Sequence, residues 1–269
     1  MSSDYGVIDT NSVASWNDEA DIVIVGLGCA GVSAAIEARE VGADVLVLER
    51  ASGGGGVTAM AAGHVYLGGG TRVQKAVGVD DSVEAMFTYL VMNTPEPDED
   101  KIRLYCDGSV EHFDWLVEQG VPFNDTMYQG KHVMQMTDEC LIWSGNEEVH
   151  PFRDKAKPAP RGHKVAEPGE GGGAKMMDCL IKRAESLGVR VIFDAHVHDI
   201  VRENDRIVGI SYRVFGAERG AVRARKGVIL ATGQFTQNDE MLEEFLPEIL
   251  VDGYTRQFAP HDDGAGHLL

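Results

Sequence analysis

The sequence predicts the α/β fold class, with a parallel sheet, an antiparallel β-meander and a helical insertion. The first sign is Asp21–Val25, a short apolar, β-branched run typical of a strand buried on both faces of a parallel sheet. The second is a glycine turn, a helix of small residues and another apolar strand, which together make a βαβ unit. The third is a series of alternating segments between residues 196 and 225, which indicates antiparallel strands.

Composition narrows the class of protein before any motif is read. The 269 residues suit one large or two small domains, and 43% apolar with 25% charged residues is typical of a globular chain. Asp plus Glu outnumber Lys plus Arg by 43 to 24, a net charge of −19 that repels nucleic acid and anionic lipid. We therefore expect no nucleic-acid partner, and no apolar run is long enough to predict a membrane span.

The first third of the chain supplies the βαβ unit. Residues 1–19 form a polar, acidic leader without the pattern of a signal peptide. After the strand at 21–25, small residues predict a helix over 29–41, ended by a glycine, and a second strand over 44–48. The stretch 51–70 is crowded with glycine and is predicted to be a long, functional loop.

The middle of the chain is predicted to be a helical and irregular insertion over about residues 80–170. Apolar spacing predicts helices over 82–92 and 98–119. Residues 123–173 are rich in Pro, Gly and His and show no period, and a further helix is expected over 174–187.

The last third returns to strands. A strand is predicted over 189–193, followed by meander segments at 196–202, 207–215 and 221–225. A separate, continuous apolar strand is predicted over 227–231.

The pattern Gly26-Leu27-Gly28-Cys29-Ala30-Gly31 matches G-x-G-x-x-G between a predicted strand and a predicted helix. Gly26 would make the tight turn, Gly28 would let a pyrophosphate approach the backbone, and Gly31 would let helix and strand pack closely. The helix N-terminus, which Cys29 and Ala30 open, would offer N–H groups to the phosphates.

An acidic residue completes this pattern. Glu49 ends the second strand roughly 20 residues after the glycines, where its carboxylate can accept hydrogen bonds from ribose hydroxyls. Strand, glycines, helix, strand and acid together predict a Rossmann-like domain that binds an adenine dinucleotide. The βαβ unit alone leaves FAD and NAD both open.

Two further stretches resemble the flavoprotein family of fumarate reductase and succinate dehydrogenase. One is Glu49-Arg50-Ala51 leading into Gly53–Gly56 and Thr58, and the other is the strand ending in Ala231-Thr232-Gly233. The resemblance implies FAD as cofactor, and it implies that the meander presents the backbone of Val197 to the adenine. Besides the residues of the βαβ unit, the cofactor contacts that it implies are Arg50, Ala51, Gly55, Gly56, Thr58, Val197, Ala231, Thr232 and Gly233.

Other stretches narrow the resemblance. Residues 62–71 (A-G-H-V-Y-L-G-G-G-T), 108–112, 115–117, 120–123 and 159–163 (A-P-R-G-H) are similar to the 3-ketosteroid dehydrogenase branch, and most similar to its Δ4-(5α) type. This implies further cofactor contacts at Ala62 and Gly63, and an FAD-dependent oxidoreductase that acts on a CH–CH bond next to a ketone, with a steroid or similar cyclic ketone as substrate. The alternatives are a fumarate reductase-like or succinate dehydrogenase-like flavoprotein and a non-catalytic nucleotide-binding fragment.

Two departures from the family pattern matter. Residues 52–56 lack the histidine that is joined covalently to the flavin in the succinate dehydrogenase branch, which implies non-covalent FAD. Family members also continue into a capping domain that carries the catalytic side chains. We therefore expect residues 20–269 to be the first segment of an FAD-binding domain, inactive alone, with no catalytic residue to assign. The electron acceptor stays open.

Several other residues allow two readings. His64 and Tyr66 are either substrate contacts or partners of local backbone groups. Arg161 and His163 either lie near the active cleft or are solvated loop residues, the more favoured reading. The four scattered cysteines and nine histidines show no metal-site spacing, so we predict no metal, and reduced thiols suggest a cytoplasmic protein.

Overall fold

The computed structural model describes residues 6–130, 135–214, 216–217, 219–251, 253, 259 and 262–269. The chain divides into two compact units, each described here by itself. Met1–Thr58 and Leu180–Leu269 form the first unit, and Ala59–Cys179 form the second. The first unit is therefore built from two stretches that are far apart in the sequence.

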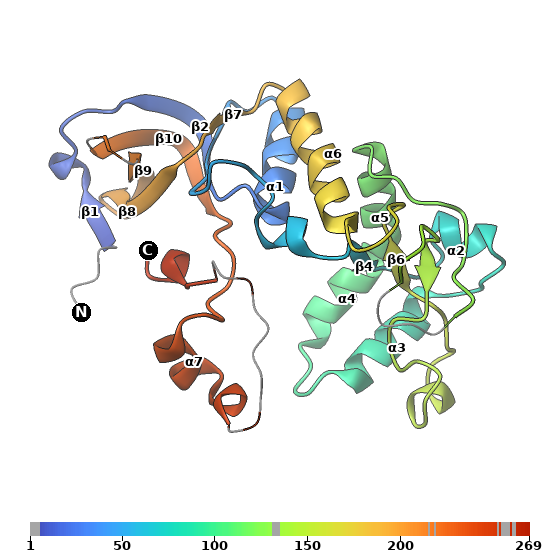
Figure 1. Ribbon diagram of the computed structural model, residues 1–269. Coiled ribbons are helices and arrows are strands. Elements are labelled where there is room, and N and C mark those ends of the chain that lie inside the picture. The colour runs from blue at the N-terminus through green and yellow to red at the C-terminus, as the bar shows by residue number, and fades with distance from the viewer. Residues whose placement is uncertain are drawn as a thin grey trace. The chain divides into compact units, whose positions relative to one another are not determined.

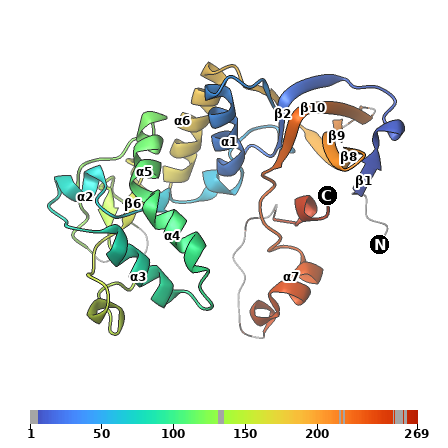
Figure 2. The same cartoon turned by 180° about the vertical axis from the view of Figure 1, so that it is seen from behind.

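A seven-stranded mixed sheet organises the first unit, with strand order β1-β8-β9-β10-β2-β3-β7 (Figure 1, Figure 2). The strands are β1 (Gly6–Asp9), β2 (Asp18–Val25), β3 (Val45–Leu48), β7 (Arg190–Ile192), β8 (Ala195–Glu203), β9 (Arg206–Val214) and β10 (Arg219–Leu230). The helices of this unit are α1 (Cys29–Glu40) and α7 (Asp239–Phe245), with short 3₁₀ turns at Thr10–Ser12, Pro247–Leu250 and Ala265–His267.

Four neighbouring strands form the parallel part of this sheet. β2 pairs in parallel with β3 and with the second half of β10, and β3 pairs in parallel with β7. All four residues of β3 are buried, as expected for a strand covered on both faces. β8, β9 and the first half of β10 form the antiparallel meander. The predicted α/β class with a parallel sheet and a meander is confirmed.

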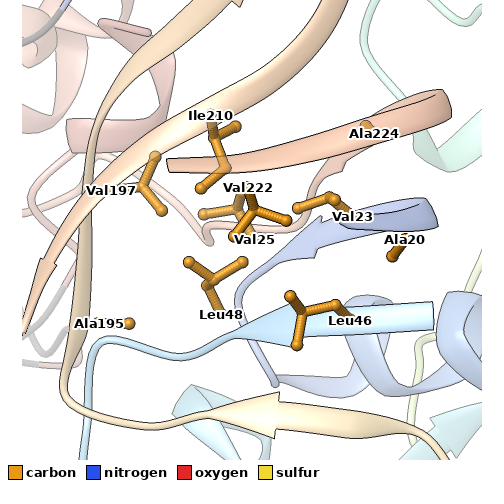
Figure 3. Packing of buried hydrophobic residues seen from close by; sticks show 10 residues of the cluster. All are labelled: Ala20, Val23, Val25, Leu46, Leu48, Ala195, Val197, Ile210, Val222 and Ala224. Atoms are coloured by element: carbon orange, nitrogen blue, oxygen red, sulfur yellow. The ribbon is translucent and has the colours of Figure 1, made fainter. Parts of the chain in front are cut away.

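The hydrophobic core of this unit lies where the meander meets the parallel strands, as Figure 3 shows. Side chains from β2, β3, β8, β9 and β10 converge there. The buried members are Ala20, Val23, Val25, Leu46, Leu48, Ala195, Val197, Ile210, Val222 and Ala224. The predicted cofactor residues that follow β2, β3 and β10 therefore extend from strands that share one core.

The prediction of two separate strands at 221–225 and 227–231 is wrong, because one strand, β10, covers both ranges as far as Leu230. It is one strand, antiparallel to β9 over Arg219–Arg223 and parallel to β2 over Val222–Ala224 and Gly227–Leu230. Its register against β2 shifts between Ala224 and Gly227. A bulge of this kind bends a strand without ending it, whereas the charged residues there suggest a break in the sequence.

The start of the chain also contains a strand that the polar composition did not predict. β1 pairs in parallel with β8, from Gly6 opposite Asp199 to Asp9 opposite Arg202. Its residues alternate between half-buried and exposed, so the strand has little apolar signal of its own. The pairing with β8, and not an apolar pattern of its own, therefore makes residues 6–9 a strand.

The second unit contains the three-stranded antiparallel sheet β4-β6-β5 and several helices. Its strands are β4 (His64–Tyr66), β5 (Leu141–Ile142) and β6 (Gly162–Lys164), and its helices are α2 (Arg72–Ala76), α3 (Val83–Asn93), α4 (Glu99–Asp107) and α5 (Ser109–Glu118), with a 3₁₀ turn at Phe152–Asp154. The 3₁₀ turn at Gly56–Met60 begins in the first unit and ends in the second. Helix α6 (Gly172–Ser186) begins here and ends in the first unit. The predicted single helix over 98–119 is wrong, because Gly108 separates α4 from α5. Among the residues that the structure describes, no helix is long and apolar enough to cross a membrane.

Candidate functional site

The first glycine turn connects β2 to α1 and depends on two close approaches. Gly26 has a φ of +100°, which favours glycine, and a Cβ there would lie 2.4 Å from the carbonyl oxygen of Ala231. A Cβ on Gly31 would lie 1.9 Å from the Gly26 carbonyl oxygen. These two glycines therefore let α1 and the end of β10 pack directly against the turn.

Gly28 stands apart because its surroundings are open. Among the described residues, no atom would lie within 4 Å of a Cβ on Gly28. Gly28 is also the N-cap of α1, and no side chain in the described part of the chain caps this helix end. Ala30 in the first turn is exposed, and burial raises the pKa of the Cys29 thiol, which keeps it neutral. The start of α1 thus has no side-chain cap among the described residues and open space beside Gly28, as an anion site requires.

Glu49 lies at the end of β3 and reaches back to this turn. One carboxylate oxygen, Oε2, accepts from the backbone N–H of Leu27 at 2.6 Å, and Oε1 accepts from the N–H of Ala51 at 2.8 Å. The Glu49 backbone also bonds on both sides, to the Ile192 carbonyl and the Ala195 N–H. The predicted ribose-binding acid is therefore anchored beside the glycine turn.

The second glycine run lies against the first turn. The Gly55 N–H donates to the Leu27 carbonyl at 2.8 Å, and a Cβ on Gly56 would sit 3.4 Å from the Gly28 Cα. Gly55 and Gly56 have φ values of +127° and +51°. Thr58 follows in a 3₁₀ turn. Residues predicted to contact the pyrophosphate from two separate motifs thus lie side by side.

The A-T-G motif reaches the same turn from β10. The Ala231 N–H donates to the Val25 carbonyl at 2.8 Å, so Ala231 continues the pairing of β10 with β2. Thr232 follows, and Gly233 has a φ of +85°. A Cβ on Gly266 would overlap Thr232, so the C-terminal residues pack on this motif.

The remaining predicted cofactor residues differ in their setting. Arg50 is exposed and pairs with Asp263 at 2.6 Å. Val197 is buried in β8, two residues before the pairing with β1 begins. Ala62 and Gly63 belong to the second unit, where a Cβ on Gly63 would lie 2.4 Å from the Gly172 carbonyl carbon. The structure therefore brings together the predicted residues of the first unit that surround the glycine turn, and it describes Ala62 and Gly63 within the second.

Arg161 is not a solvated loop residue, so that favoured reading is wrong. Its guanidinium is fully buried and donates to Asp81 through Nε at 2.9 Å and Nη2 at 2.7 Å. Burial raises the pKa of the Asp81 carboxyl, but the hydrogen bonds from Arg161 and from the Gly69 N–H outweigh burial and hold it below its usual value. This is a buried ion pair between residues 80 positions apart.

His163 is also buried, in β6. One ring nitrogen, Nε2, lies 2.8 Å from the Thr71 hydroxyl, and Nδ1 lies 3.0 Å from the Arg161 carbonyl. Burial lowers the pKa of His163 to about 4, so the ring is neutral at pH 7. His163 therefore has a local structural role in the second unit.

His64 and Tyr66 share one face of β4 and differ in burial. His64 is exposed, whereas the half-buried Tyr66 hydroxyl donates to Glu147 Oε1 at 2.8 Å. Burial and the Glu147 carboxylate raise the pKa of Tyr66 far above its usual value. The Tyr66 hydroxyl thus has a side-chain partner in the second unit, 81 residues away, and not the local backbone group that one of its two readings expected.

Three polar side chains in the second unit carry a role that the sequence pattern did not reveal. The N–H groups of residues 68–71 donate to Ser109 Oγ, Asp81 Oδ2 and Gln74 Oε1 at 2.8–3.0 Å. These acceptors lie between residues 74 and 109 and share no motif, although the capping box at Thr71 and Gln74 is a local signal for α2. The predicted functional loop is therefore tied internally at this end.

The chemistry of the first turn fits a dinucleotide cofactor. It offers uncapped helix N–H groups, open space at Gly28 for a phosphate, and an acceptor carboxylate at Glu49. The described residues contain no group of three or more side chains suited to a metal ion.

Comparison with known proteins agrees with this geometry. The family described as FAD binding domain matches residues 21–267. A 3-oxo-5-alpha-steroid 4-dehydrogenase of Comamonas testosteroni is 40% identical over 219 residues, covering 77% of this chain and 40% of that protein. An NADH:fumarate oxidoreductase of Klebsiella pneumoniae is 25% identical over 251 residues, covering 93% of this chain and 24% of that protein.

The solved structures give the same picture. A 3-ketosteroid-Δ4-(5α)-dehydrogenase from Rhodococcus jostii RHA1, in complex with 4-androstene-3,17-dione, superposes with a TM-score of 0.91 at 46% identity. The superposition covers 96% of this chain and 54% of the Rhodococcus chain. This chain therefore spans about half the length, or less, of these relatives. The expected cofactor, FAD, is confirmed at the level of the family. The chain belongs to the FAD binding domain family.

Proposed function

We propose that this chain is the FAD-binding part of an oxidoreductase that acts on the CH–CH group next to a ketone, with a 3-ketosteroid as substrate. The observation that carries the proposal is the 46% identity, over nearly the whole chain, to a structure holding 4-androstene-3,17-dione. The activity belongs to the whole protein, because the chain spans only about half of that relative.

In this proposal the first unit binds the cofactor. The N–H groups at the start of α1 hold the pyrophosphate, Gly28 and Gly56 leave room for it, and Glu49 accepts from the ribose. Val197 offers its backbone to the adenine, and Thr232 and Gly233 close the site from β10. When bound, FAD supplies hydride transfer, while the protein orients it against the substrate.

We also propose the domain limits and the setting of this protein. Residues 20–269 form the first segment of the FAD-binding domain, with an insertion over about 80–170. A cytoplasmic location is supported by the cysteines, none of which forms a disulfide.

The cofactor proposal is tested by purifying the full-length protein and precipitating it with acid. We expect yellow flavin in the supernatant, because residues 52–56 contain no histidine to link it. Flavin that remains with the pellet would disprove non-covalent binding, and a colourless protein that binds NAD alone would disprove the choice of cofactor.

The substrate proposal is tested by flavin bleaching without oxygen. We expect saturated 3-ketosteroids to bleach the flavin of the full-length protein and to turn over with an artificial electron acceptor. Succinate is the matched comparison, because the Klebsiella relative supports a fumarate reductase-like activity as the second candidate. Bleaching by succinate and not by steroids would favour that candidate.

A further inference from the structure

Glu49 already makes hydrogen bonds within the protein that a residue reserved for ribose would not need. Both carboxylate oxygens accept from backbone N–H groups, Oε2 from Leu27 and Oε1 from Ala51. The Leu27 bond joins residues 22 positions apart and is short, at 2.6 Å. Charge-assisted hydrogen bonds of this length are among the stronger ones in proteins.

The peptide groups at Leu27 connect this carboxylate to the second glycine run. Leu27 donates its N–H to Glu49, and its carbonyl accepts from the Gly55 N–H at 2.8 Å. Leu27 itself is 1% exposed, so its backbone cannot rely on water instead. Without the carboxylate, a buried N–H would lose its acceptor, and the two glycine stretches would lose the group that aligns them.

A carboxylate is well suited to two tasks at once. It has about four acceptor sites and no donor when ionised. Two sites hold the backbone, which leaves others for ribose hydroxyls. A glutamine in the same place has only one acceptor oxygen, so its amide NH₂ would face one of the two backbone N–H groups.

We propose that Glu49 is a positioning residue that fixes the glycine turn and the second glycine run in the phosphate-binding arrangement before the cofactor arrives. The inference rests on the proposed FAD site and adds a role to it. Because the turn is preformed, binding does not have to spend interaction energy on ordering it.

The first test is hydrogen exchange on the cofactor-free, full-length protein. We expect the Leu27 and Ala51 amides to be protected before FAD is added. Exchange at the unprotected rate would overturn the proposal. This measurement needs no variant, so it stays decisive if substitutions prevent folding.

The second test compares Glu49→Gln with Glu40→Gln. Glu40 ends α1 and pairs with Arg183 at 2.8 Å on the surface, so it controls for the loss of one negative charge. We expect Glu49→Gln to lower the melting temperature of the cofactor-free protein by about 2–8 °C and to speed Leu27 exchange roughly tenfold, with little change for Glu40→Gln.

The readouts separate the possible outcomes. If Glu49→Gln weakens FAD binding but leaves melting and exchange of the cofactor-free protein unchanged, Glu49 contacts ribose only and the positioning role is wrong. If the amides are protected as expected but FAD does not bind to the wild-type protein, the proposed cofactor function fails and the positioning role stands.

Discussion

Two glycine-rich stretches of this protein differ in whether side chains accept hydrogen bonds from their backbone N–H groups. At the start of α1, after Gly26-Leu27-Gly28, no side chain that the structure describes caps the helix, and no described atom would lie within 4 Å of a Cβ on Gly28. At residues 68–71, every N–H donates to a side chain of the second unit. The first stretch can receive an anion, and the second is already satisfied. Glycine content predicts a close approach of the backbone, whereas the hydrogen-bond partners determine whether a ligand can bind.

The largest expected effect comes from removing the Asp81 carboxylate, which accepts a hydrogen bond from the stretch at residues 68–71. Asp81→Ala leaves the buried Arg161 guanidinium unpaired and the Gly69 N–H without its acceptor, which should cost about 3–5 kcal/mol of unfolding free energy. Denaturant unfolding measures it. Asp80→Ala is the matched control, because Asp80 is exposed and pairs with Lys157 on the surface, where about 1 kcal/mol or less is expected. An equal loss of unfolding free energy in Asp81→Ala and Asp80→Ala would contradict the role of Asp81 in holding residues 68–71.

The second prediction concerns acid pH. The pKa of His163 is lowered to about 4 from the usual 6.5, so the folded state favours the neutral ring. Its contribution to stability should be complete above pH 6.5 and should fall as the pH drops toward 4, by at most about 3 kcal/mol. Between pH 6.5 and pH 4, the free energy of unfolding should depend less on pH in His163→Gln than in the wild-type protein. An unchanged slope would show that His163 does not titrate in this window.

The third prediction tests the proposed phosphate site beside Gly28, at the start of α1. Gly28→Ala adds a methyl group where no atom of the residues described in the structure lies within 4 Å, so the cofactor-free protein should melt nearly as the wild type does. FAD should bind about 10–100-fold more weakly, because the methyl group takes the space proposed for a phosphate. Fluorescence titration with FAD measures this. Full affinity would place the phosphate elsewhere.

The smallest expected effect is at Gly53, which opens the second glycine run. Its φ is not positive, and within the described ranges of the chain no atom would lie within 4 Å of a Cβ there. Gly53→Ala should change stability by no more than about 0.5 kcal/mol and leave FAD affinity unchanged. Gly54→Ala is the contrasting variant, because its Cβ would lie 2.6 Å from Leu27 Cδ2. A loss of affinity at Gly53 would extend the proposed site to this residue.

The sequence predicted the parts of the site that depend on local pattern. The glycine turn, helix α1, strand β3 and Glu49 all follow from a strand–glycine–helix order within one short stretch. The pair of Asp81 and Arg161 could not be predicted, because neither residue has a local signal that indicates the other. The break at Gly108 escaped detection for a similar reason, since the apolar spacing of α4 and α5 reads as one helix.

The two-part construction of the first unit has a consequence during synthesis. β2 and β3 leave the ribosome early, but their partners β7 and β10 follow only after residues 59–179 have been made. At ~5–20 residues per second, these apolar strands wait on the order of ten seconds before β7 and β10 are made. During that interval they present unpaired edges that can join other nascent chains. Production of this protein should therefore depend on chaperones that shield β2 and β3 until β10 emerges.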